Sequence, residues 1–332
     1  MKARSRRWLI ILLCVLLGLG LLFLPGLPWS ARARHTLHRA LIKAEIVLAR
    51  WRGHEPRLVS LSGKIDVPGA QVEALDSRSG WATLADKDGR FTLPDEMWYP
   101  RASYDLVISS DHEHGEIIKV TAPEKLPDSG VIDLGQLHVD PSHALNLDAL
   151  PGITSVTFAN YDEANRPFYQ ELFDKLTANQ ASDTDKLNAI QNYMRTKRNF
   201  EETQREVDSP RQVLERGSQY CGLLSTAMAT LLATGHYQVH TIDLRDNQAA
   251  PLTHVIVEVY YDNAWHLYDP TYGVTFLNKA GNVESYRDVR LEPSIITPEL
   301  LAGFPSQRRP NILALLSGVY NSGYHHYYYF KD

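Results

Sequence analysis

The chain has 332 residues, a formal net charge of -5 and 44% hydrophobic residues. This length predicts about two domains, and the composition excludes disordered, collagen-like and low-complexity architectures. The net negative charge argues against a general nucleic-acid binder, so we expect no nucleic-acid partner. The charge is unevenly distributed, because residues 1–52 carry ten Lys and Arg against one acidic residue, Glu45. We therefore expect the basic arm and the acidic body to meet different surroundings.

Residues 1–30 predict a cytoplasmic arm followed by a transmembrane anchor. Residues 8–24 are uncharged and, apart from two glycines, apolar. As a helix they would span about 25 Å, close to the bilayer core of about 30 Å. Basic residues precede the apolar stretch, as expected for a cytoplasmic N-terminus. The prediction is a single-pass protein of the bacterial inner membrane with the lipid bilayer as a partner and its body in the periplasm or outside.

A cleaved signal peptide is the alternative for the same segment. Its only small-x-small site is Ala31-Arg32-Ala33, which is far from the apolar stretch and contains an arginine. These features favour an uncleaved anchor. Residues 31–56 would then form a juxtamembrane helix, because residues 36–52 have a helical apolar rhythm and a basic character. A simple stalk helix is the other interpretation of that segment.

Residues 57–140 predict an antiparallel β-sandwich. Short stretches alternate apolar and polar residues, and turn pairs such as Pro68-Gly69 and Asp88-Gly89 separate them. That spacing is typical of sandwich folds. The segment also resembles the transthyretin-like regulatory domain attached to carboxypeptidases, which implies a sandwich that presents a neighbouring domain. The residues that carry this resemblance are Gly63, Gly69, Val72, Asp86, Asp88, Gly89, Phe91 and Leu93.

Residues 145–332 predict a second domain, which makes the fold class of the chain α+β. Residues 165–178 and 183–200 read as amphipathic helices, and residues 221–235 read as an apolar helix that Gly235 ends. Two strands joined by a turn follow. The tail YHHYYYF near the C-terminus predicts an edge strand or a cover over an apolar face, with a sugar- or peptide-binding groove as the alternative.

Cys221 is the candidate nucleophile. The chain has two cysteines, and the other, Cys14, lies in the apolar N-terminal stretch. A turn precedes Cys221, so the following helix is expected to begin at it. The free N–H groups and the dipole of a helix N-terminus favour a thiolate and can also hold the oxyanion of an acyl-transfer intermediate.

His254 and Asp269 are the candidate base and its orienting carboxylate. A hairpin with Asp262-Asn263 as its turn would pair Tyr261 with Ala264. His254 and Asp269 would then be diagonal neighbours on one face of the sheet. A shift of the turn by one residue would place them directly opposite, whereas an odd-length loop would separate their faces.

The order Cys, His, Asp, with the spacing H-x(3)-E-V-Y-x(4)-W-x(3)-D-P-T, resembles the transglutaminase-like superfamily of papain-like cysteine enzymes. The resemblance covers about residues 150–275. It implies acyl transfer from an amide through a thioester, with an amine or water as acceptor. The residues that carry it are Cys221, Ala227, Gly235, His254, Glu258, Val259, Tyr260, Trp265, Asp269, Pro270 and Thr271.

Two positions depart from that family pattern. Ile256 stands where an aromatic residue is frequent, and Gln219-Tyr220 stand before the cysteine where glycine is frequent. Gln219 is therefore the candidate oxyanion donor, with a surface turn residue as the alternative. The histidines have no metal-ligand spacing with Cys221, so we expect no metal and no cofactor.

The leading hypothesis is a membrane-anchored, extracytoplasmic cysteine acyltransferase, amidase or protease. Its substrate would be a peptide, a protein or an amine-bearing envelope component. One alternative is a non-catalytic binding or scaffold protein of the cell envelope that retains the fold. Another is acyl transfer from a thioester donor, as in arylamine acetyltransferases, which the sandwich and the anchor disfavour.

Overall fold

The computed structural model describes residues 56–74, 81–110, 114–145, 154–157, 162–199, 209–246 and 252–331. Its N-terminal part is rich in strands, which pair as two sheets. Leu61 from one sheet and Leu106 from the other share an apolar cluster, so the sheets pack against each other. The strands are β1 (Arg57–Ile65), β2 (Gln71–Ala74), β3 (Ala82–Leu84), β4 (Arg90–Trp98), β5 (Ser103–Ser109), β6 (Gly115–Thr121) and β7 (Val131–Leu137).

This β-rich region is consistent with the predicted sandwich, but one pairing differs from the antiparallel prediction. β1 pairs antiparallel with β4 and parallel with β7. The turn at Asp86–Arg90 forms as expected, because the Asp86 Oδ1 atom accepts the N–H groups of Asp88 and Arg90. The resemblance to transthyretin-like domains stays a prediction.

A second set of strands continues from this region. It contains β8 (Thr154–Thr157), β9 (Gln238–Arg245), β10 (Thr253–Tyr261), β11 (Ala264–Asp269), β12 (Val274–Thr275) and β13 (Tyr324–Lys331). Within the described residues, the strand order is β12-β11-β10-β9-β13-β3-β2-β5-β6, and β8 also pairs with β13. The tyrosine-rich tail is therefore an interior strand, because β13 pairs with β9 on one side and with β3 and β8 on the other. The prediction of an edge strand was wrong.

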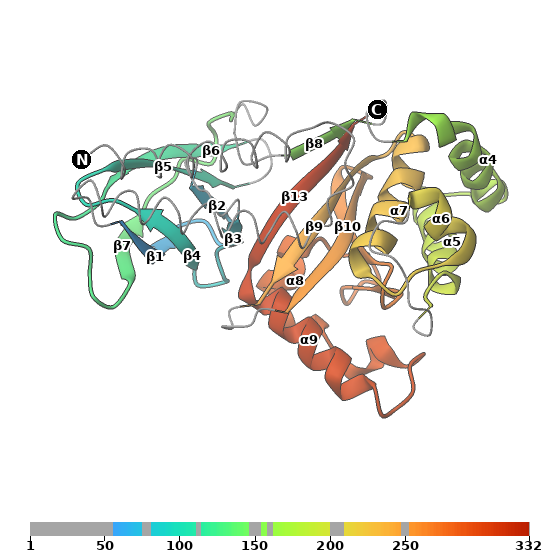
Figure 1. Cartoon of the computed structure of the whole chain (residues 1–332). Coiled ribbons are helices and arrows are strands. Elements are labelled where there is room, and N and C mark those ends of the chain that lie inside the picture. The colour runs from blue at the N-terminus through green and yellow to red at the C-terminus, as the bar shows by residue number, and fades with distance from the viewer. Residues whose placement is uncertain are drawn as a thin grey trace, which may run out of the picture. The chain divides into compact units, whose positions relative to one another are not determined.

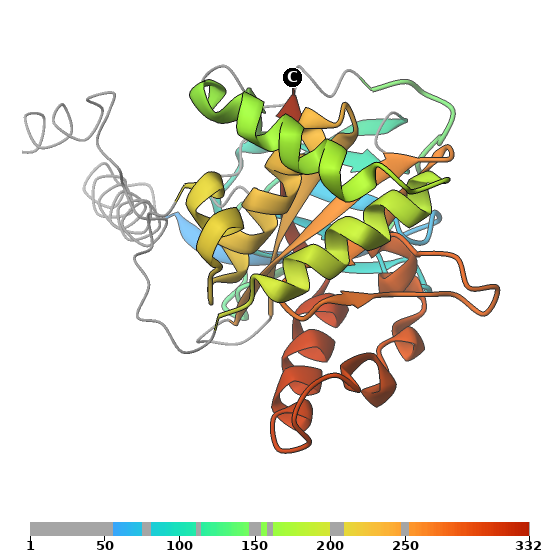
Figure 2. The ribbon, with the colours of Figure 1, turned by 90° about the vertical axis from the view of Figure 1, so that its right-hand side faces the viewer.

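Helices cover both faces of the sheet formed by β9, β10 and β11 (Figures 1 and 2). On one face are α4 (Arg166–Thr177), α5 (Asp183–Thr196), α6 (Pro210–Arg216) and α7 (Cys221–Thr234), and a large apolar cluster joins this group to the sheet. On the other face, α8 (Tyr286–Leu291) and α9 (Arg309–Ser322) share a second cluster with the sheet. The 3₁₀ helices are η2 (Glu163–Asn165), η3 (Pro293–Ile295) and η4 (Pro298–Leu301).

Local sequence explains where these helices begin and end. The Ser182 side chain caps α5, and Ser209 and Ser285 form capping boxes at α6 and α8. Each capping side chain satisfies N–H groups that a helix start leaves without an intrahelical carbonyl. α7 ends at Gly235 as predicted. Apolar residues occupy every side of α7 and most of its residues are buried, as expected for a helix packed inside a core.

The predicted fold class included a transmembrane helix, and that part needs correction. Among the described residues, no helix is long and apolar enough to cross a membrane. α7 is strongly apolar, but its 14 residues extend only about 21 Å at 1.5 Å per residue. The described part of the chain is thus α+β without a spanning helix, and on that finding the predictions of a transmembrane helix and of a single-pass membrane location are corrected. The predicted anchor at residues 1–30 and most of the juxtamembrane segment at residues 31–56 lie outside the described residues.

The predicted division between residues 57–140 and 145–332 stays a prediction. The described residues fall within one compact unit that covers residues 45–332. Tyr324 and His325 of β13 pair with Thr83 and Ala82 of β3, so backbone hydrogen bonding crosses the predicted boundary.

Candidate active site

Cys221 is the first residue of α7, and its side chain is partly buried. The loop before it is held in place, because the Ser218 N–H donates to the Lys197 carbonyl at 2.8 Å and the Asn199 N–H donates to the Ser218 carbonyl at 2.9 Å. Gly217 adopts φ +92°, and a Cβ there would lie 2.5 Å from the Lys197 carbonyl oxygen. Only glycine fits this position without a shift of the loop. The thiol therefore has a fixed place at the positive end of the helix dipole.

His254 and Asp269 form a buried pair on neighbouring strands. The His254 Nε2 atom lies 2.7 Å from Asp269 Oδ2, and both side chains are almost fully enclosed. The other carboxylate oxygen, Oδ1, accepts the backbone N–H groups of Thr271 and Tyr272, each at 3.0 Å. Both oxygens of Asp269 thus have hydrogen-bond partners, which an enclosed carboxylate requires.

The hairpin register is the first of the alternatives that the sequence left open. Tyr261 pairs with Ala264, and the turn residues Asp262 and Asn263 have φ values of 50° and 61°. Two successive left-handed residues are the mark of a type I′ hairpin turn. This register keeps His254 and Asp269 on one face of the sheet, as the diagonal-neighbour interpretation requires.

Gln191 of α5 fixes the strand end that carries the carboxylate. Its Nε2 group donates to the Asp269 carbonyl at 2.9 Å and to the Val274 carbonyl at 3.1 Å. The side chain is buried in the middle of an otherwise apolar helix face. Sequence reasoning missed Gln191, because no local pattern reveals that a helical glutamine reaches two carbonyls on distant strands.

The electrostatics of His254 combine opposing effects. Burial alone would lower the pKa of this imidazole. The charge of Asp269, the hydrogen bond to it, and the hydrogen bond and charge of Cys221 together raise the pKa to about 10. The three predicted site residues therefore interact with one another. The raised pKa favours the imidazolium form beside the sulfur.

Tyr272 and Phe304 lie beside this group. The ring centroids of Tyr272 and His254 are 5.1 Å apart, and Phe304 packs edge-on against Tyr272 at 5.9 Å. Burial, followed by the charges of Asp269 and Cys221, raises the pKa of Tyr272, so its hydroxyl stays protonated. Tyr272 was missed as a site residue, although its position three residues after Asp269 was a usable signal.

Gln219 lies in the loop between α6 and α7, two residues before Cys221, and is partly buried. Its role as an oxyanion donor stays a prediction. Within the part of the chain that the structure describes, no group of three His, Cys, Asp or Glu side chains could hold a metal ion.

Residues 170–270 match the family model of the transglutaminase-like superfamily. This segment is a transglutaminase-like domain. The matched range contains Cys221, His254 and Asp269, and proteins of this superfamily are usually cysteine enzymes. No match was found among curated proteins or among solved structures.

Proposed function

We propose that the transglutaminase-like domain is a cysteine enzyme that acts on amide bonds through a thioester. Cys221 is the nucleophile, His254 is the general base and acid, and Asp269 orients the imidazole. One observation carries the proposal: Asp269, His254 and the thiol at the head of α7 interact in series. A nucleophile, a base within hydrogen-bond reach and a third group that orients the base are the parts that this chemistry needs.

The reaction has two acyl-transfer steps. The Cys221 sulfur attacks the amide carbon, the carbon–sulfur bond forms, and the oxyanion is held by N–H groups near the start of α7. The carbon–nitrogen bond then breaks, and His254 gives its proton to the departing amine. In the second step, His254 takes a proton from the incoming acceptor, the acceptor attacks the thioester, and the thiol is restored.

The acceptor decides the outcome of the second step. Water gives hydrolysis, whereas a primary amine gives a new amide bond. The acyl donor is a peptide or a protein, and the amine belongs to a second peptide, a protein or an amine-bearing polymer. The partly exposed position of Cys221 supports access by such large substrates.

The test is a pair of assays on the full-length protein and on Cys221→Ser. A library of glutamine-containing peptides is incubated with and without hydroxylamine, and ammonia and hydroxamate are measured. We expect ammonia release that depends on Cys221, and mass spectrometry of a rapidly quenched sample should show an acyl group on Cys221. Hydroxamate without free acid indicates transamidation, and free acid indicates hydrolysis.

A scaffold protein with the same fold would give a different result. Its Cys221 would react with iodoacetamide near pH 6 no faster than an ordinary thiol, and His254→Ala would not change the alkylation rate. That combination, together with no turnover of any peptide, would replace the enzyme proposal with the scaffold one.

A further inference from the structure

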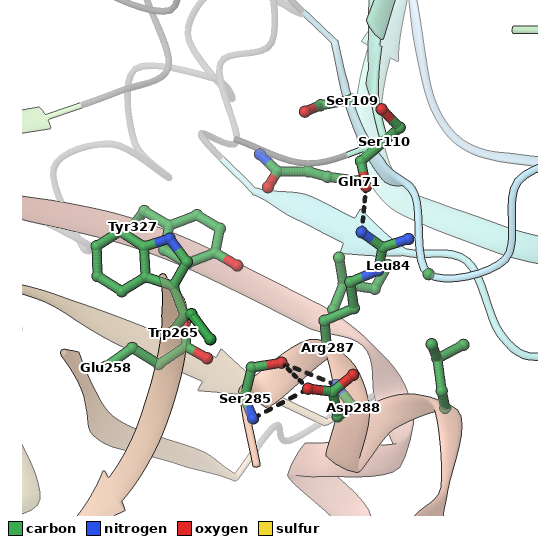
Figure 3. Close-up of a pocket in the computed structure, with 13 residues that line it drawn as sticks. Gln71, Leu84, Ser109, Ser110, Glu258, Trp265, Ser285, Arg287, Asp288 and Tyr327 are labelled. Carbon is green, nitrogen blue, oxygen red and sulfur yellow. Dashed lines mark hydrogen bonds between the residues drawn. The ribbon is translucent and has the colours of Figure 1, made fainter. Parts of the chain in front are cut away.

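A cavity of about 350 Å³ lies apart from the Cys221 site. Residues of the β-rich region, including Gln71 and Ser109, form one wall. Residues of β10, β11, β13 and α8, including Trp265 and Tyr327, form another (Figure 3). This volume is within the range of small-molecule sites. None of the three proposed catalytic residues lines it.

Two aromatic side chains form the apolar wall of this cavity. The ring centroid of Trp265 lies 4.1 Å from that of His240 in a stacked arrangement, and the Tyr327 ring meets the same imidazole edge-on at 4.7 Å. Their shared contact with His240 fixes both rings in place. Aromatic faces held in this way offer a rigid, apolar surface to a flat ligand.

The charged side chains of the lining already have protein partners. The Arg287 guanidinium donates to the carbonyls of Ser110 and Pro68. Asp288 accepts the N–H and the hydroxyl of Ser285 in the capping box of α8. These charged groups are thus hydrogen-bonded to neutral groups of the protein, which hold them at the wall of the cavity.

Glu258 is the most deeply buried charged group of the lining, with 2% of its surface exposed. One carboxylate oxygen lies 2.7 Å from His240 Nε2, and the other accepts the backbone N–H of Tyr286. Both oxygens are thus engaged, so Glu258 contributes shape and polarity to the floor of the cavity rather than an open anionic site.

Gln71 and Ser109 are different. Within the described part of the chain, neither side chain makes a hydrogen bond. Figure 3 shows the Gln71 amide extended toward the side of the cavity that holds Trp265 and Tyr327. An amide and a hydroxyl can each donate and accept a hydrogen bond. A ligand in this cavity therefore meets neutral polar groups opposite an aromatic wall.

We infer that this cavity binds a neutral sugar ring. The hydroxyl groups of a sugar can donate to and accept from Gln71 and Ser109, while the apolar C–H face of the ring covers Trp265 and Tyr327. The volume accommodates one or two rings. A phosphate or carboxylate ligand is held best by a guanidinium that presents two parallel N–H groups, and both terminal nitrogens of Arg287 already donate to backbone carbonyls.

The walls of the cavity are set before any ligand binds. Gly69 adopts φ +72°, and a Cβ there would lie 2.6 Å from the Arg287 Nε atom, so the turn and the guanidinium are in close contact. β10 also carries both Glu258 and His254. They are four residue steps apart along an extended strand, which is roughly 13 Å. The sugar site is therefore close to the proposed catalytic centre but distinct from it, and its existence does not depend on turnover.

The test is calorimetric titration of the full-length protein with two neutral disaccharides, cellobiose and N,N′-diacetylchitobiose, and with propylammonium as a cationic probe. We expect at least one disaccharide to saturate a single site. Gln71→Ala should weaken that binding by about tenfold through the loss of its hydrogen bonds. Gln170→Ala, at a partly buried position on α4, is the matched control and should leave binding unchanged. Cys221→Ser should bind as tightly as the wild type.

A second variant locates the binding site independently of affinity. Trp265→Phe keeps an aromatic face, so calorimetry should still show binding, whereas any tryptophan fluorescence change on titration should disappear. The inference is overturned if neither disaccharide saturates a site below about 10 mM, if Gln71→Ala binds as the wild type does, or if the fluorescence change survives in Trp265→Phe. Saturable binding of propylammonium alone would identify a cation site instead.

Discussion

Two histidine–carboxylate pairs lie on the same sheet with the same geometry but different surroundings. His254 Nε2 lies 2.7 Å from Asp269 Oδ2, and His240 Nε2 lies 2.7 Å from Glu258 Oε2. All four side chains are buried, and β10 supplies one member of each pair. Nevertheless the pKa of His254 is raised to about 10, whereas that of His240 is lowered to about 3.

The surroundings explain the difference. His240 lies between the rings of Trp265 and Tyr327, and its burial disfavours the charged imidazolium. His254 is also buried, but its contact with Cys221 adds to the effect of Asp269. The comparison shows that a short distance between a histidine and a carboxylate does not identify an active site. A third reactive group beside the imidazole distinguishes the two pairs.

The largest expected effect is a difference in kcat between variants of the two histidines. In the assay that detects the thioester chemistry, His254→Ala should lower kcat by about 10⁴-fold or more, because both proton transfers lose their carrier. His240→Phe should change kcat by no more than about threefold, because we place no step of the chemistry on it. Comparable losses in both variants would break the distinction.

The two carboxylates give the next largest effect. Asp269→Asn should lower kcat by about 10³-fold, because an amide can hold the imidazole in the wrong tautomer. It should leave Cys221 open to iodoacetamide. Glu258→Gln keeps an oxygen and an N–H group in the same volume and should leave kcat nearly unchanged. A drop in kcat with Glu258→Gln that matches the one with Asp269→Asn would show that the buried pair also supports catalysis.

His240→Phe should lower the free energy of unfolding although it leaves kcat nearly unchanged. His240→Phe removes one hydrogen-bond partner of the enclosed Glu258 carboxylate, which should cost about 2 kcal/mol of unfolding free energy. Urea unfolding followed by circular dichroism measures this change. The alkylation rate of Cys221 in the folded protein should stay at the wild-type value, and a slower rate would indicate that the two pairs are coupled.

The two pairs should affect the pH dependence of the unfolding free energy at opposite ends of the pH range. The raised pKa of His254 gives a contribution that is fully present below about pH 6.5 and is lost as the pH rises toward 10. The lowered pKa of His240 gives one that is present above about pH 6.5 and is lost as the pH falls toward 3. The urea midpoint should therefore change less with pH on the alkaline side in His254→Gln than in the wild type. It should change less with pH on the acid side in His240→Phe.

The smallest expected effect concerns the turn that sets the register of the proposed catalytic pair. Asn263 has φ 61°, so Asn263→Ala should cost about 1 kcal/mol, whereas Asn263→Gly should be neutral or slightly stabilising. Thermal unfolding gives both values. Turnover should persist in both variants, because the hydrophobic pattern of β10 and β11 also holds the register. Loss of turnover with retained stability would mean that the turn alone keeps His254 beside Asp269.

Local patterns were enough to predict much of the transglutaminase-like domain. The turn before Cys221 and the glycine after its helix marked both ends of α7. The Asp262-Asn263 pair pointed to a two-residue turn, and one of the registers that this turn allows is the one that brings His254 to Asp269. These features depend on neighbours in the chain or on a two-residue turn, so the backbone preferences of a few residues determine them.

Other features required the tertiary structure. The tail YHHYYYF has the composition of a cover or an edge strand, but β13 enters the middle of the sheet because β9 pairs with one side of it and β3 and β8 with the other. The contact of Gln191 with the Asp269 carbonyl joins residues 78 positions apart. The pairing of His240 with Glu258 and the cavity beside it likewise depend on which strands become neighbours. The sequence by itself determined the local geometry of the site. The long-range pairing of strands decided that His240 is buried among aromatic rings and that His254 lies beside a thiol. Burial and nearby charge depend on residues that are distant in the chain.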